Sequence, residues 1–233
     1  MNKNIKKTEK VQLIQILGLL HVYKGNVETV ALPGINITIN KGEKVVVRGK
    51  SGVGKSTLLH CLGGLVRPTS GKIIVENRNI VDFNDDQLAE YRCKTVGIIY
   101  QSFNLAPYLT IKENIEFPMV LAKQNSEYIE KRTHELVEKL EIERYLDQKP
   151  TYLSGGEQQR AAIAVALGNN PPIILADEPT GNLDVNTAEI VYDLLTKTCE
   201  YYRTTLVLAS HDPIASNYAN REIDLPKLQT IEL

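Results

Sequence analysis

The stretch Lys44-Val45-Val46-Val47-Arg48-Gly49-Lys50-Ser51-Gly52-Val53-Gly54-Lys55-Ser56-Thr57 decides the fold of this chain. Its first five residues read as a short buried strand, and the apolar run from Ser56 to Leu65 continues as a helix. Between them lies the pattern G-x-x-x-x-G-K-[ST], which turns backbone N–H groups inward to hold phosphate oxygens. Lys55 adds a positive charge beside the outer phosphates, and Ser56 can reach a magnesium ion. A glycine-rich turn with a chance lysine is the weaker interpretation, because the flanking strand and helix are those the motif requires.

A second strand-like run, Ile173-Ile174-Leu175-Ala176-Asp177-Glu178, ends in two acids. This is typical of a central parallel strand with functional groups at its carboxyl end. Asp177 could bind magnesium through water, and Glu178 could orient or deprotonate an attacking water. A solvated turn is the alternative. The phosphate loop makes it less favourable, since phosphoryl transfer needs both a metal anchor and a group that positions water.

A third motif, Leu153-Ser154-Gly155-Gly156-Glu157-Gln158-Gln159-Arg160, opens a predicted helix with two glycines. Ser154 and Glu157 have the S-x-x-E spacing of a capping box, which is the purely structural interpretation. However, each glycine costs about 1 kcal/mol relative to alanine within a helix, so stability alone would not place two there. Bare amides at the positive end of a helix dipole suit an anion such as phosphate, and the motif therefore predicts a second anion site.

Length and composition limit the number of domains and the classes of function that the chain can have. A chain of 233 residues is long enough for one sizeable α/β core with a small inserted subdomain, but short for two full domains. Its 27 basic and 28 acidic side chains indicate neither nucleic-acid binding nor binding to an anionic membrane surface. The cysteines lack the spacing of a disulfide framework or a zinc site, which fits a reducing cytosol; they are Cys61, Cys93 and Cys199.

The N-terminus superficially resembles a signal peptide, because four lysines precede the apolar run Val11–Leu17. No small-residue cleavage site follows, and no stretch approaches the roughly 18 apolar residues that span a bilayer. We therefore expect a disordered basic leader, then an edge strand, and no direct membrane insertion.

The organisation of the chain follows from its turns and periodicities. Residues 11–84 form a β-rich flank with turns at Lys24-Gly25-Asn26 and Pro33-Gly34, together with the phosphate loop. Residues 85–153 are mostly helical, with Ser126 as a helix cap. Residues 154–233 alternate helix and strand: a helix from Ser154 to about Gly168, an amphipathic helix over 187–201 whose core face carries Ile190, Val191, Leu194, Leu195 and Cys199, and a strand over 205–210 that ends at His211.

These motifs, in this order, resemble the nucleotide-binding domain of an ABC-type ATPase over nearly the whole chain. The LSGGEQQR run is the most specific element of the resemblance, since phosphate loops also occur in kinases and GTPases. The resemblance implies an α/β fold in one domain, residues 1–233: a P-loop NTPase core with a parallel sheet, an N-terminal antiparallel β subdomain and an inserted α-helical subdomain.

The resemblance also implies roles for residues that would mean little alone. Tyr23 falls where the family places an aromatic ring against adenine, and stacking of this kind contributes about 1–3 kcal/mol. Gln101 matches a glutamine that contacts magnesium and transmits movement toward a membrane partner. Asp184 matches an acid that communicates between subunits, and His211 matches a histidine at the γ-phosphate. Without the resemblance, Tyr23 and His211 would be interpreted as ordinary surface or core residues.

The runs Ser102–Thr110, Glu113–Pro118 and Ala176–Asp184 resemble the macrolide-exporter and lipoprotein-releasing branch of the family. This implies an ATPase subunit with ATP and Mg²⁺ as ligands, which forms a homodimer around two ATP molecules and drives an integral membrane permease. Each phosphate loop would face Ser154, Gly155, Gly156 and Glu157 of the partner. The subunit would be cytoplasmic, held at the inner face of the membrane by the permease.

Two departures from the family pattern stand out. Val165 occupies a position where the family usually has arginine. The tail Arg221–Leu228 lacks the Asp-Gly turn that commonly precedes the last strand, so the sequence leaves the pairing of that strand open.

Three other functions remain as alternatives. A regulatory ABC ATPase coupled to a signalling or cell-division partner, without cargo transport, would carry the same catalytic residues. A soluble ABC protein acting on ribosomes or DNA is weaker, because such proteins have two of these domains in one chain or a long coiled-coil insertion. A small-molecule kinase would leave the LSGGEQQR run unexplained.

Overall fold

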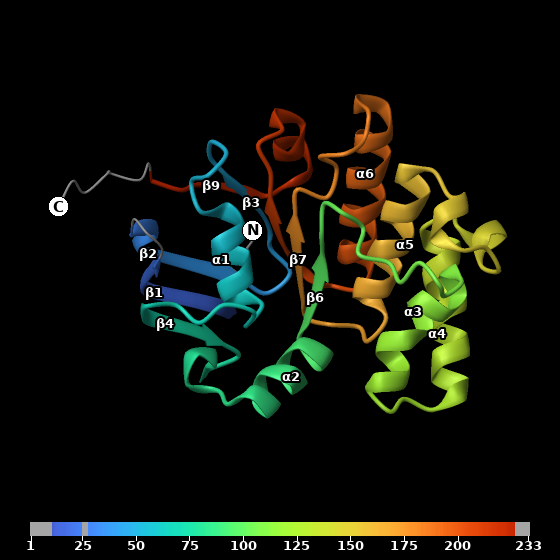
Figure 1. Ribbon diagram of the computed structural model, residues 1–233, viewed down its shortest axis with the longest axis horizontal. Helices are drawn as coiled ribbons and strands as arrows, with labels where there is room; N and C mark the ends of the chain where they lie inside the picture. The colour runs from blue at the N-terminus through green and yellow to red at the C-terminus, as the bar shows by residue number, and fades with distance from the viewer. Residues whose placement is uncertain (1–10, 25–27, 227–233) are drawn as a thin grey trace, which may run out of the picture.

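The structure is a computed structural model that describes residues 11–24 and 28–226. The expected basic leader and most of the Lys24-Gly25-Asn26 turn lie outside the described residues. Two sheets and a group of helices lie side by side (Figure 1), with an antiparallel sheet at one end, a parallel sheet in the middle and helices α3 and α4 at the other end. Across the described ranges, none of the helices combines the length and the apolar character needed to cross a bilayer.

The central sheet has five strands in the order β6-β7-β8-β3-β9, and every neighbouring pair is parallel. Its strands are β3 (Lys44–Arg48), β6 (Val96–Ile99), β7 (Ile173–Asp177), β8 (Thr205–Ala209) and β9 (Arg221–Asp224). Because all five run the same way, the phosphate loop after β3, the acids after β7 and His211 after β8 emerge at one edge of the sheet.

Helices cover both faces of this sheet. Val45 and Val47 pack into the hydrophobic cluster that contains α1, whereas Val46 packs into the cluster that contains α5 and α6. This alternation is the period of two expected for a strand buried on both faces. The helices are α1 (Lys55–Leu62), α2 (Asp85–Lys94), α3 (Ile111–Leu121), α4 (Ser126–Lys139), α5 (Gly155–Leu167) and α6 (Val185–Tyr201), with short 3-10 helices η1 (Ile80–Asp82), η2 (Glu143–Tyr145), η3 (Pro150–Tyr152) and η4 (Pro213–Tyr218).

The antiparallel sheet has the order β2-β1-β4-β5. Its strands are β1 (Gln12–Tyr23), β2 (Thr29–Asn40), β4 (Ser70–Val75) and β5 (Arg78–Asn79). The expectation of an edge strand after the leader is wrong, because β1 pairs with both β2 and β4. Pro33-Gly34 is not a turn but lies inside β2, where the register with β1 shifts and Gly34 has a positive φ of 84°. Proline is tolerated there because β2 is the edge strand.

Two further expectations need correction. The side chain that caps α4 is Asn125, which accepts a hydrogen bond from the Tyr128 N–H, and not Ser126. Ile190, expected on the core face of α6, is 52% exposed. The range 85–153 is mostly helical, as expected, and also contains β6, which pairs with β7 in the central sheet.

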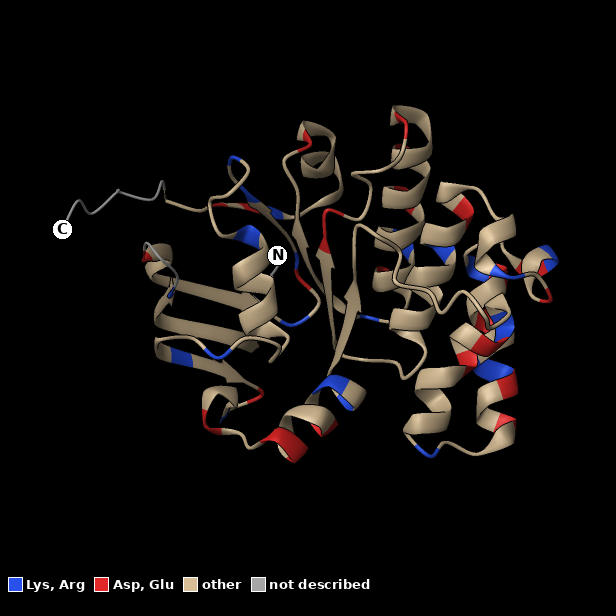
Figure 2. Cartoon of the chain, viewed as in Figure 1, with Lys and Arg blue, Asp and Glu red and all other residues tan. Residues whose placement is uncertain are grey.

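β9, the last strand of the described residues, pairs in parallel with β3, and Arg221 makes an ion pair of 2.9 Å with Glu43. The strand whose pairing the sequence left open would follow the tail Arg221–Leu228 and lies outside the described residues. Charged residues lie mainly on the helices and at the ends of strands, while β6 has none and β7 has none before Asp177 at its end (Figure 2).

Gly97 in β6 lies where α5 packs tightly against the central sheet. A Cβ atom there would overlap the Ala166 carbonyl oxygen and lie 2.5 Å from Ile174 Cδ1. Because a backbone carbonyl cannot move aside by changing rotamer, we expect Gly97→Ala to lower the free energy of unfolding by about 3 kcal/mol, near the upper end of overpacking costs.

Urea denaturation would measure this loss. Gly42→Ala is the control, because its Cβ meets no atom within 4 Å and its positive φ of 73° leaves only backbone strain, of about 1 kcal/mol. Equal losses for the two variants would contradict the packing argument.

Candidate functional site

A cavity of about 960 Å³ opens at the carboxyl edge of the central sheet, beside the antiparallel sheet. It brings together residues that the sequence analysis named from distant segments, and four that it missed. The named ones are Tyr23, Gly49, Lys50, Ser51, Gly52, Gly54, Lys55, Ser56, Thr57, Gln101, Glu178 and His211, and the missed ones are Thr29, Ala31, Arg48 and Asp224. Val53 lies in the same loop but is buried in the core.

The phosphate loop is built on glycines with positive φ. Gly49, Gly52 and Gly54 have φ angles of 149°, 80° and 100°, a region that side-chain-bearing residues rarely adopt. A Cβ on Gly54 would also collide with the Ala31 carbonyl oxygen of β2, so only glycine lets the antiparallel sheet approach the loop. Gly54 is the N-cap of α1, and the positive end of that helix dipole therefore faces the loop.

The ammonium group of Lys55 lies inside this loop, with the residue only 6% exposed. Its Nζ donates to the carbonyl oxygens of Gly49 at 3.0 Å and Lys50 at 3.5 Å, and lies 3.4 Å from Glu178 Oε1. A buried charge is tolerated when hydrogen bonds and an opposite charge surround it, and these contacts provide both. Lys55 therefore links the loop to the acid at the end of β7.

Glu178 lies between two cationic or potentially cationic side chains. Its Oε2 is 2.7 Å from His211 Nδ1, while Oε1 faces Lys55. Glu178 itself has a positive φ of 47°, which is uncommon for a residue with a side chain, and its N–H donates to the Ala209 carbonyl of β8. Such strained residues cluster at active sites. The carboxylate is thus held at the mouth of the phosphate loop by backbone and side-chain contacts.

Side chains with oxygen atoms of the kind that coordinate metal ions lie next to the loop. The Ser56 hydroxyl donates to Asp177 Oδ1 at 3.0 Å, and the other carboxylate oxygen of Asp177 is 4.0 Å from His60 Nε2. His60 was not predicted, although it follows Ser56 by four residues on α1 and so shares its helix face. Gln101 makes reciprocal contacts with Asn182 at the same edge, with Nε2 3.3 Å from Asn182 Oδ1.

Tyr23, at the end of β1, also lines the cavity and is 45% exposed. Its hydroxyl is 3.3 Å from Thr57 Oγ1 at the start of α1. The Tyr23 side chain therefore reaches the start of the helix that follows the phosphate loop and remains nearly half exposed.

The LSGGEQQR helix start does not belong to this cavity. Ser154 caps α5, its N–H donating to Glu157 Oε2 at 2.8 Å and its hydroxyl accepting from the Glu157 N–H, so the capping box is formed. Burial works against ionisation of Glu157, but hydrogen bonds from Tyr145 and Ser154 outweigh it and lower its pKa. None of Ser154, Gly155, Gly156 and Glu157 lines the cavity that holds the phosphate loop.

The two glycines of that helix differ in their surroundings. A Cβ on Gly156 would lie 2.5 Å from Thr187 Cγ2, whereas a Cβ on Gly155 would meet only the mobile ends of Leu183, at 3.0 Å, and Phe103, at 3.6 Å. The argument that stability alone would not place glycine here is therefore wrong for Gly156, because packing against Thr187 requires it. Thr187 is itself fixed by Asp184, the N-cap of α6, whose pKa is lowered by hydrogen bonds from the Thr187 hydroxyl and N–H.

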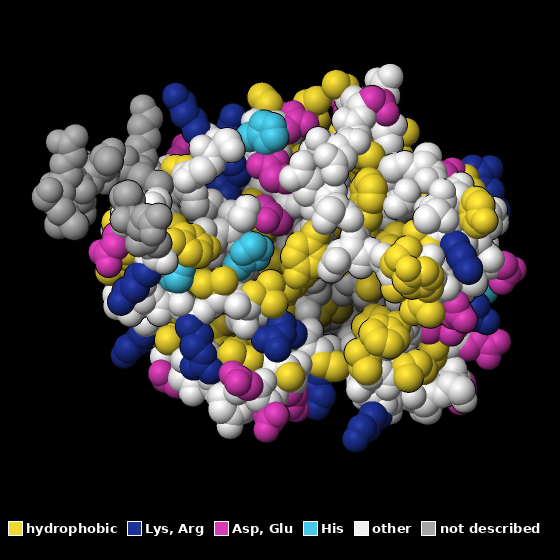
Figure 3. Space-filling view, in the orientation of Figure 1, with side chains coloured by type: hydrophobic (Ala, Val, Ile, Leu, Met, Phe, Trp, Pro, Cys, Tyr) yellow, Lys and Arg dark blue, Asp and Glu magenta, His cyan; other side chains and the backbone are white. Residues whose placement is uncertain are grey.

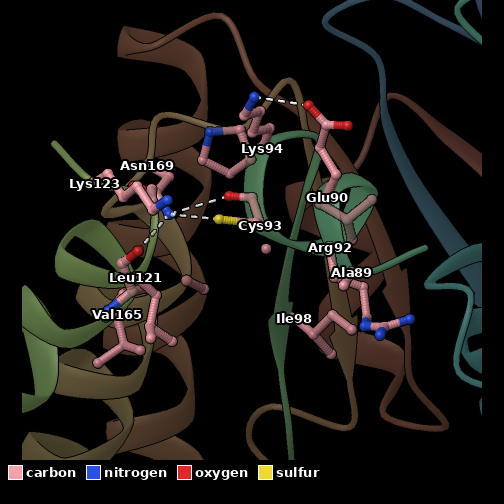
Figure 4. A pocket seen from close by; sticks show the side chains of 16 residues that line it. Ala89, Glu90, Arg92, Cys93, Lys94, Ile98, Leu121, Lys123, Val165 and Asn169 are labelled. Carbon is pink, nitrogen blue, oxygen red and sulfur yellow. Dashed lines mark hydrogen bonds and ion pairs between the residues drawn. The ribbon is translucent and has the colours of Figure 1, made fainter. Parts of the chain in front are cut away.

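A second cavity, of about 800 Å³, lies between helices α2 and α3, with β6 and the end of α5 completing its lining. We call it the α2–α3 groove. Hydrophobic side chains gather over α3 beside a hollow in the surface (Figure 3). The lining of the groove combines apolar residues with four charged ones: the apolar ones include Ala89, Val96, Ile98, Pro118, Leu121, Ala122, Val165 and Ala166, and the charged ones are Glu90, Arg92, Lys94 and Lys123. At its floor Asn169 Nδ2 donates to the carbonyl oxygens of Cys93 at 3.1 Å and Pro118 at 2.9 Å, joining α2 to α3 (Figure 4).

Comparisons with known proteins identify the family. The ABC transporter family model matches residues 32–181. An uncharacterised ABC transporter ATP-binding protein of Methanocaldococcus jannaschii, MJ0796, is 41% identical over 91% of this chain and 93% of its own length. The lipoprotein-releasing system ATP-binding protein LolD of Xylella fastidiosa is 41% identical over 87% of this chain and 84% of its own.

Among solved structures, a dimeric post-hydrolysis state of the MJ0796 cassette bound to ADP and Pi is similar, with a TM-score of 0.84 and 40% identity over 91% of this chain and 94% of that one. This confirms the expected fold class, a parallel P-loop core with an antiparallel subdomain and inserted helices. The chain belongs to the ABC transporter family, as an ATP-binding subunit that hydrolyses ATP.

Proposed function

We propose that this subunit dimerises head to tail around two ATP molecules and drives a permease of the macrolide-exporter and lipoprotein-releasing type. The observation that carries the proposal is the position of Glu178, whose carboxylate lies between Lys55 and His211 at the mouth of the phosphate loop. The relative named for lipoprotein release and the dimeric ADP-bound neighbour support it. The subunit would lie at the inner face of the cell membrane, held there by the permease.

The cavity suits a purine nucleoside triphosphate. The amides of the loop between Gly49 and Thr57 and the Lys55 ammonium would hold the phosphates, and the exposed ring of Tyr23 would stack on adenine. The base and the phosphates would thus be bound by different sheets, which the Gly54 contact with Ala31 keeps together.

The donor set next to the loop fits Mg²⁺, which prefers a few hard oxygen ligands together with substrate phosphates over a cage of protein ligands. Ser56, Gln101 and Asp177 offer a hydroxyl, an amide oxygen and a carboxylate, and the Ser56 hydroxyl already contacts the Asp177 carboxylate. Among the described residues no cluster of three or more His, Cys, Asp or Glu side chains forms an alternative metal site. When bound, the ion would neutralise charge on the phosphate oxygens.

The chain's own residues would carry the hydrolysis step. Glu178 would orient the attacking water and accept its proton, a role that general bases fill with a contribution of about 10²-fold to 10⁴-fold. Lys55 and His211, on either side of it, would stabilise negative charge on the γ-phosphate. Because both also contact Glu178 directly, arrival of the nucleotide would draw them toward phosphate and free the carboxylate for water.

The second anion site would serve the partner's ATP. The start of α5 presents free amides and a glycine, Gly155, that packing within the chain does not require, yet it lies outside the chain's own cavity. In a two-fold dimer, each phosphate loop would face the start of α5 of its partner, so that the free amides and Gly155 would contact the partner's ATP. Asp184 would transmit changes at the subunit interface, because it accepts a hydrogen bond from Thr187, whose methyl group lies against Gly156.

We expect Glu178→Gln to bind ATP but to lose about 10²-fold to 10⁴-fold of its hydrolysis rate, because the amide keeps the shape of the side chain without its basicity. An ATP-bound dimer should accumulate, as seen by light scattering after size-exclusion chromatography, with phosphate release measuring turnover. Glu200→Gln, which alters an exposed acid paired with Lys44, is the control. Near-normal hydrolysis by Glu178→Gln would refute the assignment.

The contact between Gly156 and Thr187 predicts a coupled pair of substitutions. Alanine is about 1 kcal/mol better than glycine in a helix, but at position 156 its Cβ meets Thr187 Cγ2, and overpacking costs about 1–3 kcal/mol. Gly156→Ala alone should therefore destabilise. Thr187→Ser removes the methyl group and keeps the hydroxyl that bonds Asp184.

In the Thr187→Ser background, Gly156→Ala should thus become neutral or stabilising. Thermal and urea unfolding of the wild type, the two single variants and the double variant would give the coupling energy between the two positions. If the effects of Gly156→Ala and Thr187→Ser on stability were additive, packing against α6 would not explain the glycine at position 156.

The α2–α3 groove is our candidate for the permease contact. The groove is mainly apolar, and Phe117, Val120 and Leu121 of α3 are each more than half exposed. Its β6 wall leads directly to Gln101 at the nucleotide cavity, so a segment seated there would be coupled to the site.

We expect the wild-type subunit to copurify with an integral membrane protein, and Leu121→Asp to lose most of that association, because a carboxylate would have to be desolvated in the contact. Affinity capture from detergent-solubilised membranes with mass spectrometry would test this. Ile190→Asp, at a similarly exposed apolar residue of α6, is the control. Absence of any membrane partner for the wild type would contradict the transporter role, and a partner without export activity would favour the regulatory alternative.

A further inference from the structure

His21 is a buried polar residue that the site described above does not use. It lies on β1, two residues before Tyr23, and is only 8% exposed. Neither ring nitrogen has a hydrogen-bond partner among the described residues. An unpaired polar group is costly to bury, and an aliphatic side chain would fill the position without that cost. The ring must therefore contribute through a contact other than hydrogen bonding.

That contact is with Tyr23. The two rings meet edge to face, with centroids 4.5 Å apart and an interplanar angle of 85°. This is the favoured arrangement of an aromatic pair, which stabilises beyond the area it buries. On its other side, the Tyr23 hydroxyl is 3.3 Å from Thr57 Oγ1. The Tyr23 ring is thus held at two points, by His21 and by the helix that follows the phosphate loop.

The backbone around the pair is fixed as well. His21 pairs with Leu32 and Val22 with Val30, so Ala31 of β2 is an extra residue in a bulge. Bulges of this kind often lie beside active sites and redirect side chains. Here the bulged residue lines the nucleotide cavity, and its carbonyl oxygen is the atom that requires glycine at position 54. The Val22 N–H donates to Thr69 Oγ1 at 3.0 Å, which anchors the strand from the β4 side.

We propose that His21 is a positioning residue that holds the Tyr23 ring ready to stack on the base of the nucleotide. The inference rests on the proposed role of Tyr23. A ring ordered before binding loses less conformational entropy when the base arrives, and this raises affinity without adding a contact. His21 therefore contributes to affinity for ligands that carry a base and not to affinity for phosphate alone.

The experiment compares Mg-ADP with Mg-pyrophosphate, which has the same two phosphates and no base, by isothermal titration calorimetry. His21→Leu keeps much of the volume and removes the aromatic edge, whereas His21→Phe keeps an aromatic edge. We expect His21→Leu to weaken ADP binding about 2-fold to 10-fold, as for loss of an aromatic pair, and to leave pyrophosphate binding unchanged. His21→Phe should restore most of the ADP affinity.

A double-mutant cycle with Tyr23→Ala distinguishes positioning from general stability. Tyr23→Ala should weaken ADP binding about 5-fold to 100-fold, as for loss of base stacking, and in that background His21→Leu should have no further effect. Leu20→Ala, next to His21 on the same strand, controls for loss of stability, which thermal unfolding of each variant would measure.

Two results would overturn the proposal: a His21→Leu variant that weakens pyrophosphate as much as ADP, or one that leaves ADP binding unchanged while Tyr23→Ala weakens it. If Tyr23→Ala itself leaves ADP binding unchanged, the stacking role of Tyr23 fails and the role of His21 fails with it.

Discussion

The buried ammonium of Lys55 is the interaction on which the site depends. It donates to the carbonyl oxygens of Gly49 and Lys50, the second of which also accepts from the Val53 N–H, and it faces the carboxylate of Glu178 at the end of a different strand. A buried cation with these contacts fixes both the loop and the acid. It also explains the loop glycines, since only residues that accept positive φ allow the chain to fold around one side chain.

Contacts with the same loop fix the position of the antiparallel sheet. Its bulged residue Ala31 lies against Gly54, and the Tyr23 hydroxyl lies near Thr57, so the sheet contacts the loop and the first turn of α1. The ring proposed to bind the base, on one sheet, and the loop proposed to bind the phosphates, on the other, can then contact a single nucleotide. The spacing between them is set by backbone contact, which is less adjustable than contact between long side chains.

The start of α5 combines a structural role with its proposed role as an anion site. Ser154 and Glu157 close the helix end, Gly156 makes room for Thr187, and Gly155 is left with no neighbour that requires it. Thr187 in turn bonds Asp184, so the helix start and the acid that caps α6 form one unit. At the far end of α5, Asn169 joins α2 to α3 beneath the groove. Helix α5 therefore connects the proposed subunit interface with the proposed permease contact.

The sequence by itself determined what depends on neighbours within a few residues: the strand, loop and helix around Gly49–Thr57, the strand that ends at Asp177, and the capping box of Ser154 and Glu157. It also named most of the residues that line the cavity, the loop residues because a motif carries its chemistry in its own spacing, and Tyr23, Gln101 and His211 through the family resemblance. Only the tertiary structure decided that β1 lies inside its sheet, that Pro33-Gly34 belongs to a bulged strand, that Gly156 needs room for Thr187 and that His21 lies beneath Tyr23. Strand order, register and contacts between elements depend on burial shared by residues far apart in the chain, and no local pattern encodes such pairs.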